Sequence, residues 1–258
     1  MLLPLADKNP LRHIRHGYVN WTMIGLCVAV FVYQLGLDEQ ASQLFAYAYG
    51  AIPAVIFGVA ELGPEIKQVP DLATLATSMF LHGGIMHIAG NMLFLWVLGD
   101  NVEDSLGHAR YVIFYLACGV CAALAHALSD PGSQVPMFGA SGAISGIIGG
   151  YLVLHPKAPI KTLVWVFIVE LPAWLVLGIW TVFQVLSAIG SAGGAGGGVA
   201  WWAHIGGLVA GIALIAPMRR KGVALFDKGV EKQHPRGPRI TMRQGPWSRP
   251  KGPWSGRN

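Results

Sequence analysis

The chain has 258 residues, of which 53% are apolar and only 12% are charged, and its mean hydropathy is +0.51. A soluble domain carries roughly 25% charged residues, so this composition excludes an ordinary soluble enzyme and indicates a polytopic membrane protein with one domain and tails. The net charge of +5 is concentrated at the ends, because residues 218–258 hold eleven Lys and Arg against Asp227 and Glu231. The three cysteines lie in apolar stretches and predict no disulfide framework.

Six stretches approach the length of a membrane-spanning helix, which needs about 20 apolar residues within a range of about 17–25. The second and fourth stretches are short or glycine-rich. Such spans are tolerated where they are buried in protein or line a wet cavity. The expected spans are 21–37, 84–99, 111–128, 137–154, 163–186 and 199–218.

The segments between and beyond these spans predict three regions. Residues 1–18 form a basic N-terminal segment, 19–218 a six-helix domain, and 219–258 a basic Pro/Gly/Arg-rich tail that is expected to be disordered and to lie on anionic lipid. Within the domain, the long connection 38–77 is apolar in patches and broken by prolines, which predicts a half-embedded loop. The glycine run 187–198 predicts a flexible connection.

Loop charges predict the orientation of the spans, because Lys and Arg favour the cytoplasmic side. Both ends are basic, and an even number of spans places both termini in the cytoplasm. Lys157 and Lys161 agree with this arrangement, and the acidic connection 38–77 is expected outside. The segment 99–110 is the exception, because it carries three acids yet is counted inside.

The fourth and sixth stretches carry the residues of a serine nucleophile and its base. Ser141 lies in Gly139-Ala140-Ser141-Gly142, and small residues recur at every fourth position after it. His204 shares a helix face with Gly207 and Gly211, so the two small faces could pack closely. Close packing could bring Ser141 Oγ within the about 2.6–3.2 Å that a general base requires.

Each half of this pattern also has a plainer interpretation. Faces of small residues usually serve helix packing alone, and a single serine in a membrane helix usually bonds its own backbone. A histidine inside a membrane is harder to dismiss, because its polar atoms need partners. The joint occurrence of Ser141 and His204 is therefore far more specific than either residue.

The second stretch adds His87 and Asn91, which lie four residues apart on one helical face. Two donors aimed at one point suit a developing oxyanion, although a structural polar cluster is the alternative. His82 lies five residues before His87, about 140° around a helix, and is expected to point elsewhere. A metal site of His82, His87 and His204 is a weaker alternative, because no carboxylate or thiolate completes it. Among the acids only Glu170 could join a triad, so a Ser–His dyad is expected.

These residues resemble the motifs of the rhomboid intramembrane serine proteases of bacterial type. The resemblance covers about 19–218 and rests on His82, His87 and Asn91, on Gly139-Ala140-Ser141-Gly142, and on Ala203-His204-Ile205-Gly206-Gly207 with Gly211. It implies six helices around a water-filled cavity that opens outward, and a location in the bacterial inner membrane. The fifth span and the glycine loop would form a mobile gate.

The resemblance also implies the residue roles. Ser141 would be the nucleophile and His204 the base, while His87, Asn91 and the Ser141 backbone N–H would bind the oxyanion. His82 would be structural, as would Gly139, Gly142, Gly207 and Gly211 around the site. The expected activity is cofactor-free and metal-free endoproteolysis of membrane proteins with a helix-destabilised transmembrane segment, with lipid but not nucleic acid as the other partner.

Two positions depart from the family pattern. Some members carry an aromatic residue four positions after the serine, where this chain has Ser145, so His204 must be held by other contacts. Some members also carry a Trp-Arg pair in the first loop, which is absent here. The rival functions are a non-catalytic rhomboid relative that binds membrane clients, and a small transporter. The first would be expected to lack Ser141 or His204, and the second predicts repeats or charged pore residues.

Overall fold

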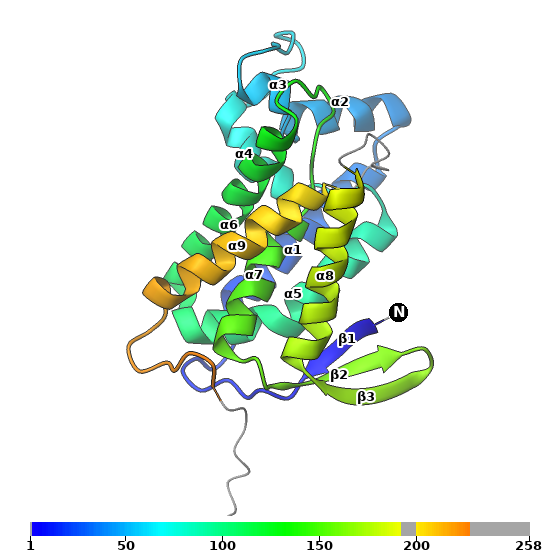
Figure 1. Ribbon diagram of the computed structural model, residues 1–258. Helices are drawn as coiled ribbons and strands as arrows, with labels where there is room; N and C mark the ends of the chain where they lie inside the picture. Colours follow the sequence, from blue (N-terminus) through cyan, green and yellow to red (C-terminus); the bar gives the residue numbers. More distant parts are fainter. Residues whose placement is uncertain (1, 192–199, 228–258) are drawn as a thin grey trace, which may run out of the picture.

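The computed structural model describes residues 2–191 and 200–227, and most of them belong to a helical bundle (Figure 1). Among these residues, five helices are long and apolar enough to cross a membrane. The prediction of a polytopic helical membrane protein is therefore confirmed. The five helices are α1 (Tyr18–Leu35), α5 (Ile85–Leu106), α6 (His108–Ser129), α8 (Ala173–Ser191) and α9 (Trp201–Met218).

Helix α7 (Ser141–Leu154) corresponds to the fourth expected span but has only 14 residues. At 1.5 Å per residue it is about 21 Å long, which is less than the roughly 30 Å of a bilayer core. Almost every residue of α7 is buried, and the helix lies at the centre of the bundle between α5, α6 and α9. The count of six spans thus stays a prediction, because α7 is a buried central helix shorter than a full span.

The connection between α1 and α5 is folded into short helices. These are α2 (Glu39–Tyr49), α3 (Pro53–Ile56) and α4 (Thr74–Thr77), with 3-10 turns η1 (Asp71–Ala73) and η2 (Ser78–Phe80). Asp38 caps α2 by accepting the Ala41 N–H at 2.8 Å. Ala51 and Met137 exchange two backbone hydrogen bonds, of 2.9 and 2.8 Å, which tie this connection to the chain entering α7. Its expected half-embedded position stays a prediction.

The acids of the segment 99–110 lie in the last turns of α5, where they bind the N-terminal segment. The Asp104 carboxylate accepts the backbone N–H groups of residues 12–14 at 2.6–3.0 Å. Glu103 accepts those of Val19 and Asn20 at 3.1 and 2.8 Å, in the first turn of α1, where a helix favours negative charge. These acids are therefore internal hydrogen-bond acceptors, and this explains why they do not follow the loop-charge pattern.

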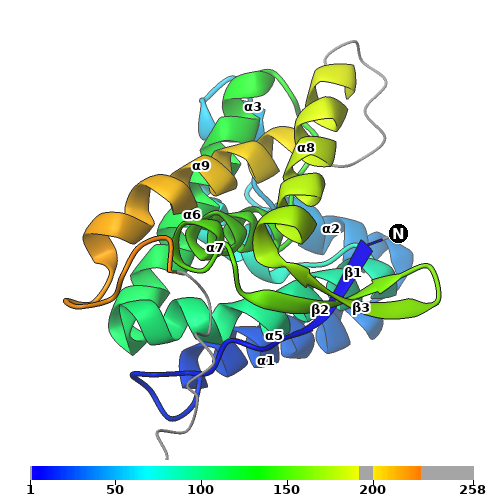
Figure 2. The same ribbon diagram turned by 60° about the horizontal axis from the view of Figure 1, so that its bottom comes forward.

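A three-stranded antiparallel sheet was not expected from the sequence. Its strands are β1 (Leu2–Asp7), β2 (Pro159–Val164) and β3 (Phe167–Pro172), in the order β1-β2-β3. The expected span 163–186 was therefore wrong in its first ten residues, which form a hairpin before α8 begins. Figure 2 shows this hairpin projecting from the bundle beside α8.

The chain after α9 returns to the end of the bundle that carries the sheet. The Arg220 N–H donates to the Ser105 carbonyl at 2.9 Å, and the Phe226 N–H donates to that of Val153 at 2.7 Å. Residues 219–227 of the expected tail are thus hydrogen-bonded to the ends of α5 and α7. The expected flexible connection 187–198 was wrong in its first five residues, which belong to the last turns of α8. Its remaining residues, 192–198, and the rest of the tail, 228–258, lie outside the described residues.

Candidate active site

Glycine contacts between α7 and α9 position the two central residues of the site. A Cβ atom added at Gly207 would collide with the Gly142 carbonyl, and one added at Gly211 would collide with the backbone of Gly146. The prediction that the two small faces pack closely is confirmed. Gly139, just before α7, has a φ of +131°, which favours glycine in the turn that leads into the helix.

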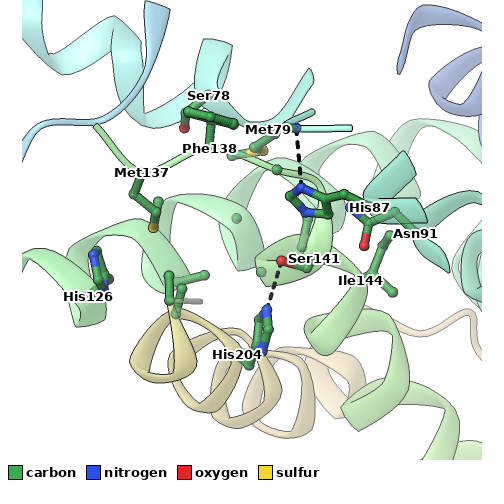
Figure 3. A pocket seen from close by; sticks show the side chains of 18 of the residues that line it. Ser78, Met79, His87, Asn91, His126, Met137, Phe138, Ser141, Ile144 and His204 are labelled. Atoms are coloured by element: carbon green, nitrogen blue, oxygen red, sulfur yellow. Dashed lines mark hydrogen bonds between the residues drawn. The ribbon is translucent and has the colours of Figure 1, made fainter. Parts of the chain in front are cut away.

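This packing brings Ser141 and His204 into contact. Ser141 is the first residue of α7, and its Oγ lies 2.7 Å from His204 Nε2 (Figure 3). That distance is within the range required for proton transfer to a general base. Ser145, one turn later, donates its hydroxyl to the Ser141 carbonyl at 2.7 Å, so it shows the ordinary behaviour of a helical serine.

The second nitrogen of His204 binds a residue that the sequence analysis did not identify. Gln184 of α8 is buried, and its Oε1 lies 2.6 Å from His204 Nδ1. An amide oxygen can only accept, so Nδ1 carries the proton and Nε2 is free to accept the Ser141 proton. The rings of Trp180 and Trp201 also lie against His204, each with a centroid separation of 6.0 Å. These contacts hold the imidazole in the absence of an aromatic residue at position 145.

His87 and Asn91 converge on the opposite side of Ser141 from His204 (Figure 3). The Gly83 N–H donates to His87 Nδ1 at 3.3 Å, so His87 Nε2 carries a proton and can donate. That nitrogen lies beside Gly139, because a Cβ atom added there would be 2.8 Å from it. The Asn91 Nδ2 group is buried and has no hydrogen-bond partner within the described part of the chain. His87, Asn91 and Ser141 line the same cavity, and the Ser141 N–H is at the start of α7, where a helix leaves its N–H groups without intrahelical partners.

His82 does not line the cavity. It precedes α5, so the helical rotation expected between it and His87 does not apply, and their ring centroids are 5.2 Å apart. Its ring also packs edge-on against Phe31 of α1, and its backbone N–H donates to Gln34 Oε1 at 3.0 Å. These contacts support the structural role that the resemblance implies.

A cavity of about 780 Å³ contains the whole arrangement. It reaches the α6–α7 connection, at the end of the bundle opposite the sheet, because α7 is short and starts inside the bundle. Sequence patterns gave no signal for several of its walls, since Met86, Phe94, Met137, Trp180 and Gln184 occur in no motif. His126 of α6 also lines it, and its Nδ1 has no partner among the residues described.

Glu170 does not line this cavity. It belongs to β3, its side chain is 48% exposed, and it pairs with Lys8. Within residues 2–191 and 200–227, no three His, Cys, Asp or Glu side chains form a group that could hold a metal ion.

A comparison with protein families decides the relationship. The model of the Rhomboid domain matches residues 70–221, which is more than half of the chain and includes every residue discussed above from His82 to His204. The chain belongs to the rhomboid family. The β2–β3 hairpin of this rhomboid lies inside the matched range, whereas β1 and α1 precede it.

Curated relatives give the same picture. The chain is similar to the rhomboid protease GluP of Bacillus subtilis, with 42% identity over 78 residues, and to the rhomboid protease GlpG of Klebsiella pneumoniae, with 25% identity over 207 residues. It is also 33% identical to RHOMBOID-like protein 5 of Arabidopsis thaliana over 104 residues. The matches cover 30%, 79% and 35% of this rhomboid, and 15%, 64% and 34% of the relatives' lengths.

Proposed function

We propose that this rhomboid is an intramembrane serine endopeptidase with a Ser141–His204 dyad. The observation that carries the proposal is the 2.7 Å contact between Ser141 Oγ and His204 Nε2 inside a cavity within a bundle of apolar helices. Two of the relatives are named rhomboid proteases, which supports the same activity.

The reaction begins when Ser141 Oγ attacks a peptide carbonyl carbon and His204 Nε2 takes the hydroxyl proton. Gln184 keeps the other ring nitrogen protonated and so holds the imidazole in the accepting tautomer. As the carbonyl oxygen gains negative charge, it faces the donors of His87, Asn91 and the Ser141 backbone. Fixed donors of this kind are effective because they need no reorganisation during the reaction.

The second half of the reaction releases the two products. His204 gives its proton to the leaving amine as the C–N bond breaks, which leaves an ester on Ser141. A water molecule in the cavity then attacks the ester carbonyl carbon while His204 takes one of its protons. The bond between that carbon and Ser141 Oγ breaks as His204 returns the proton to Oγ, which releases the carboxylic acid product and restores Ser141. Both steps use groups of this chain alone, so the proposed mechanism includes no cofactor and no metal.

The expected substrates are membrane proteins with a transmembrane segment that unwinds easily. A helix hides its backbone carbonyl groups in hydrogen bonds, so small or helix-breaking residues near the scissile bond favour entry into the cavity. We place the protein in the bacterial inner membrane, with both termini in the cytoplasm, because both ends of the chain are basic.

Labelling with a fluorescent fluorophosphonate tests the proposal. Wild-type protein in detergent should be labelled covalently, whereas Ser141→Ala and His204→Ala should both remain unlabelled, because a serine without its base is a poor nucleophile. Equal labelling of wild type and Ser141→Ala would overturn the dyad. The alternative, a non-catalytic protein that binds membrane clients, predicts no labelling of any of the three.

A further inference from the structure

The tip of the β2–β3 hairpin is an exposed apolar surface outside the active site. Four consecutive residues at and beside the turn are exposed by 84, 78, 70 and 63%, and no charged residue occurs between Lys161 and Glu170. Figures 1 and 2 show the hairpin projecting from the base of α8, away from the other helices. The four residues, Trp165, Val166, Phe167 and Ile168, are called the hairpin tip below.

Both faces of the hairpin tip are apolar, and the polar residues of the hairpin lie toward its base. Neighbouring residues of a strand point to opposite faces, so Phe167 and Ile168 expose both faces of the sheet to the surroundings. A hairpin that covered a protein surface would be apolar on one face and polar on the other. A tip that is apolar on both faces instead fits an apolar environment that surrounds it on both sides.

The charges of the hairpin lie at its base. Lys161 and Glu170 are paired across the strands, and Glu170 also forms an ion pair with Lys8. Three residue steps separate this pair from the last pair before the turn, Val164 and Phe167, which corresponds to about 10 Å at roughly 3.3 Å per step. This length matches the 5–10 Å by which interfacial elements enter the headgroup and acyl boundary.

The turn itself carries a bulky aromatic residue at a costly backbone position. Trp165 has a φ of +58°, in the left-handed region where glycine or asparagine is usual in two-residue hairpin loops. Tryptophan is the residue most typical of the membrane–water interface, where its apolar ring and its N–H group are both satisfied. A contact of the Trp165 side chain with that interface would offset the backbone strain.

The hairpin tip lies next to the exposed apolar surface of a candidate membrane span. Helix α8 follows β3 directly, and large apolar side chains such as Trp174, Val182, Phe183 and Leu186 are exposed along this candidate span. Among the described residues, β3 pairs with a strand on one side only, and backbone groups left without a partner at a sheet edge are tolerated at the hydrated interface but not in the hydrocarbon core. At the level of the lipid headgroups, the apolar tip can contact acyl chains while the charged base and the backbone groups of the β3 edge stay hydrated.

We propose that the β2–β3 hairpin is a lipid-binding anchor, whose tip enters the bilayer interface beside the start of α8. The Ala173 N–H donates to the Ala158 carbonyl at 2.9 Å, and the Trp174 N–H donates to that of Pro156 at 2.9 Å. These bonds join the segment just before β2 to the first turn of α8, which follows β3 directly, so both ends of the hairpin meet at the start of α8. The anchor thereby fixes the level in the membrane at which α8, the helix that carries Gln184, begins.

Site-directed spin labelling tests the anchor without depending on protease activity. The exposed Cys121 is replaced by alanine, the buried Cys27 and Cys118 are kept, and a nitroxide is attached to Val166→Cys. Lys157→Cys is the matched control, because Lys157 is an exposed residue in the loop that precedes the same hairpin. Both proteins are placed, one copy per disc, in nanodiscs of phosphatidylcholine and phosphatidylglycerol.

Two collision rates of the nitroxide are measured, one with oxygen, which concentrates in lipid, and one with a water-soluble nickel chelate. The oxygen rate divided by the nickel rate should be several-fold higher at position 166 than at position 157. An equal ratio at both positions would overturn the anchor. A label at position 166 that reacts with nickel in single-copy discs, but is shielded in liposomes with many copies, would also overturn it and indicate self-association through the β3 edge.

Discussion

His204 uses its two ring nitrogens for two different partners, and this pair of contacts selects one tautomer. Gln184 accepts from Nδ1 at 2.6 Å, while Ser141 Oγ lies 2.7 Å from Nε2. In serine proteases with a triad, an aspartate orients the base and also stabilises the imidazolium charge. A neutral glutamine can do only the first, so we expect orientation to be its main contribution.

Replacement of Gln184 by leucine should therefore lower turnover while leaving substrate binding nearly unchanged. General base catalysis contributes about 10²–10⁴ in rate, and we expect the loss to lie within the lower part of that range, because His204 stays in place but is free to rotate. Thr181→Ala is the matched control, since Thr181 lies one turn earlier on α8 and bonds only the Leu177 carbonyl. Single-turnover cleavage of a model transmembrane substrate measures both. Equal rates for the two variants would contradict the orienting role.

The oxyanion donors give a graded prediction. Loss of one donor from an oxyanion site costs about 10²–10³ in rate, so His87→Ala and Asn91→Ala should each reduce turnover by that order. The double variant should lose less than the product of the two, because the donors act on one oxygen and the Ser141 N–H remains. Single-turnover rates should be compared with thermal unfolding. If both variants melt earlier yet turn over at the wild-type rate, the two residues are structural.

The motifs were sufficient to predict that Ser141 and His204 approach each other, because each lies in a stretch of small residues whose spacing sets a helix face. They could not predict Gln184. It is 20 residues from His204 on another helix, and a single glutamine in an apolar stretch has no periodic pattern. His82 lies outside the cavity as expected, but the reason differs: α5 begins at Ile85, so His82 precedes the helix and is not rotated around it.

At the scale of elements, the contact between α7 and α9 decides whether the site exists. The glycines remove side chains from the interface, so the two backbones touch, and Ser141 and His204 are carried on one closely packed pair of helices. Any atom added between them must separate the helices, since backbone atoms cannot move aside as side chains can.

Gly211→Ala should therefore lower both stability and activity. Its Cβ would collide with the Gly146 backbone, and overpacking of this kind typically costs about 1–3 kcal/mol. Gly25→Ala is the control, because a Cβ atom at this helical position of α1 meets nothing within 4 Å. The melting temperature in detergent and the cleavage rate should both be lower for Gly211→Ala than for the wild type. Both should equal the wild-type values for Gly25→Ala. Unchanged values for Gly211→Ala would show that the close packing is not required.

The β2–β3 hairpin shows where hydropathy misleads. Residues 163–172 are as apolar as a span, so a hydropathy window joins them to α8. Two features separate them: the prolines at 159 and 172, and the β-branched residues between, which favour strands. Exposed hairpins are rarely this apolar in soluble proteins. Hydropathy alone therefore predicts one long span for such a hairpin and the helix that follows it.

At the scale of the whole molecule, the N-terminal strand, the ends of α5 and α7 and residues 219–227 meet at one end of the bundle. Asp7 of β1 lies at this junction, where its Oδ2 accepts from Asn101 Nδ2 and from the Tyr151 hydroxyl, both at 2.7 Å. Burial raises the pKa of Asp7 to about 7, the Tyr151 hydrogen bond opposes this shift, and the charge of Asp100 adds to it.

This pKa predicts how stability changes with pH. An acid whose pKa is higher in the folded state than in the unfolded state binds a proton on folding, so its contribution to stability falls as pH rises from about 4 through about 7. Asp7→Asn resembles the protonated form and removes this dependence. Its melting temperature should exceed that of the wild type by more at pH 8 than at pH 5. Parallel melting curves of the two proteins across this range would contradict the shift.

The central claim is that Ser141 is the nucleophile of an intramembrane protease, and one comparison tests it most directly. Purified wild type, Ser141→Ala and Ser145→Ala are reconstituted in liposomes with a transmembrane substrate that contains a small, helix-breaking segment. Ser145 is the matched control, because it is a serine one turn away whose hydroxyl bonds only the helix backbone. We predict cleavage by the wild type and by Ser145→Ala, and a loss for Ser141→Ala on the order of the 10⁶ seen when a serine protease loses its nucleophile. Cleavage by Ser141→Ala at the wild-type rate would contradict the account.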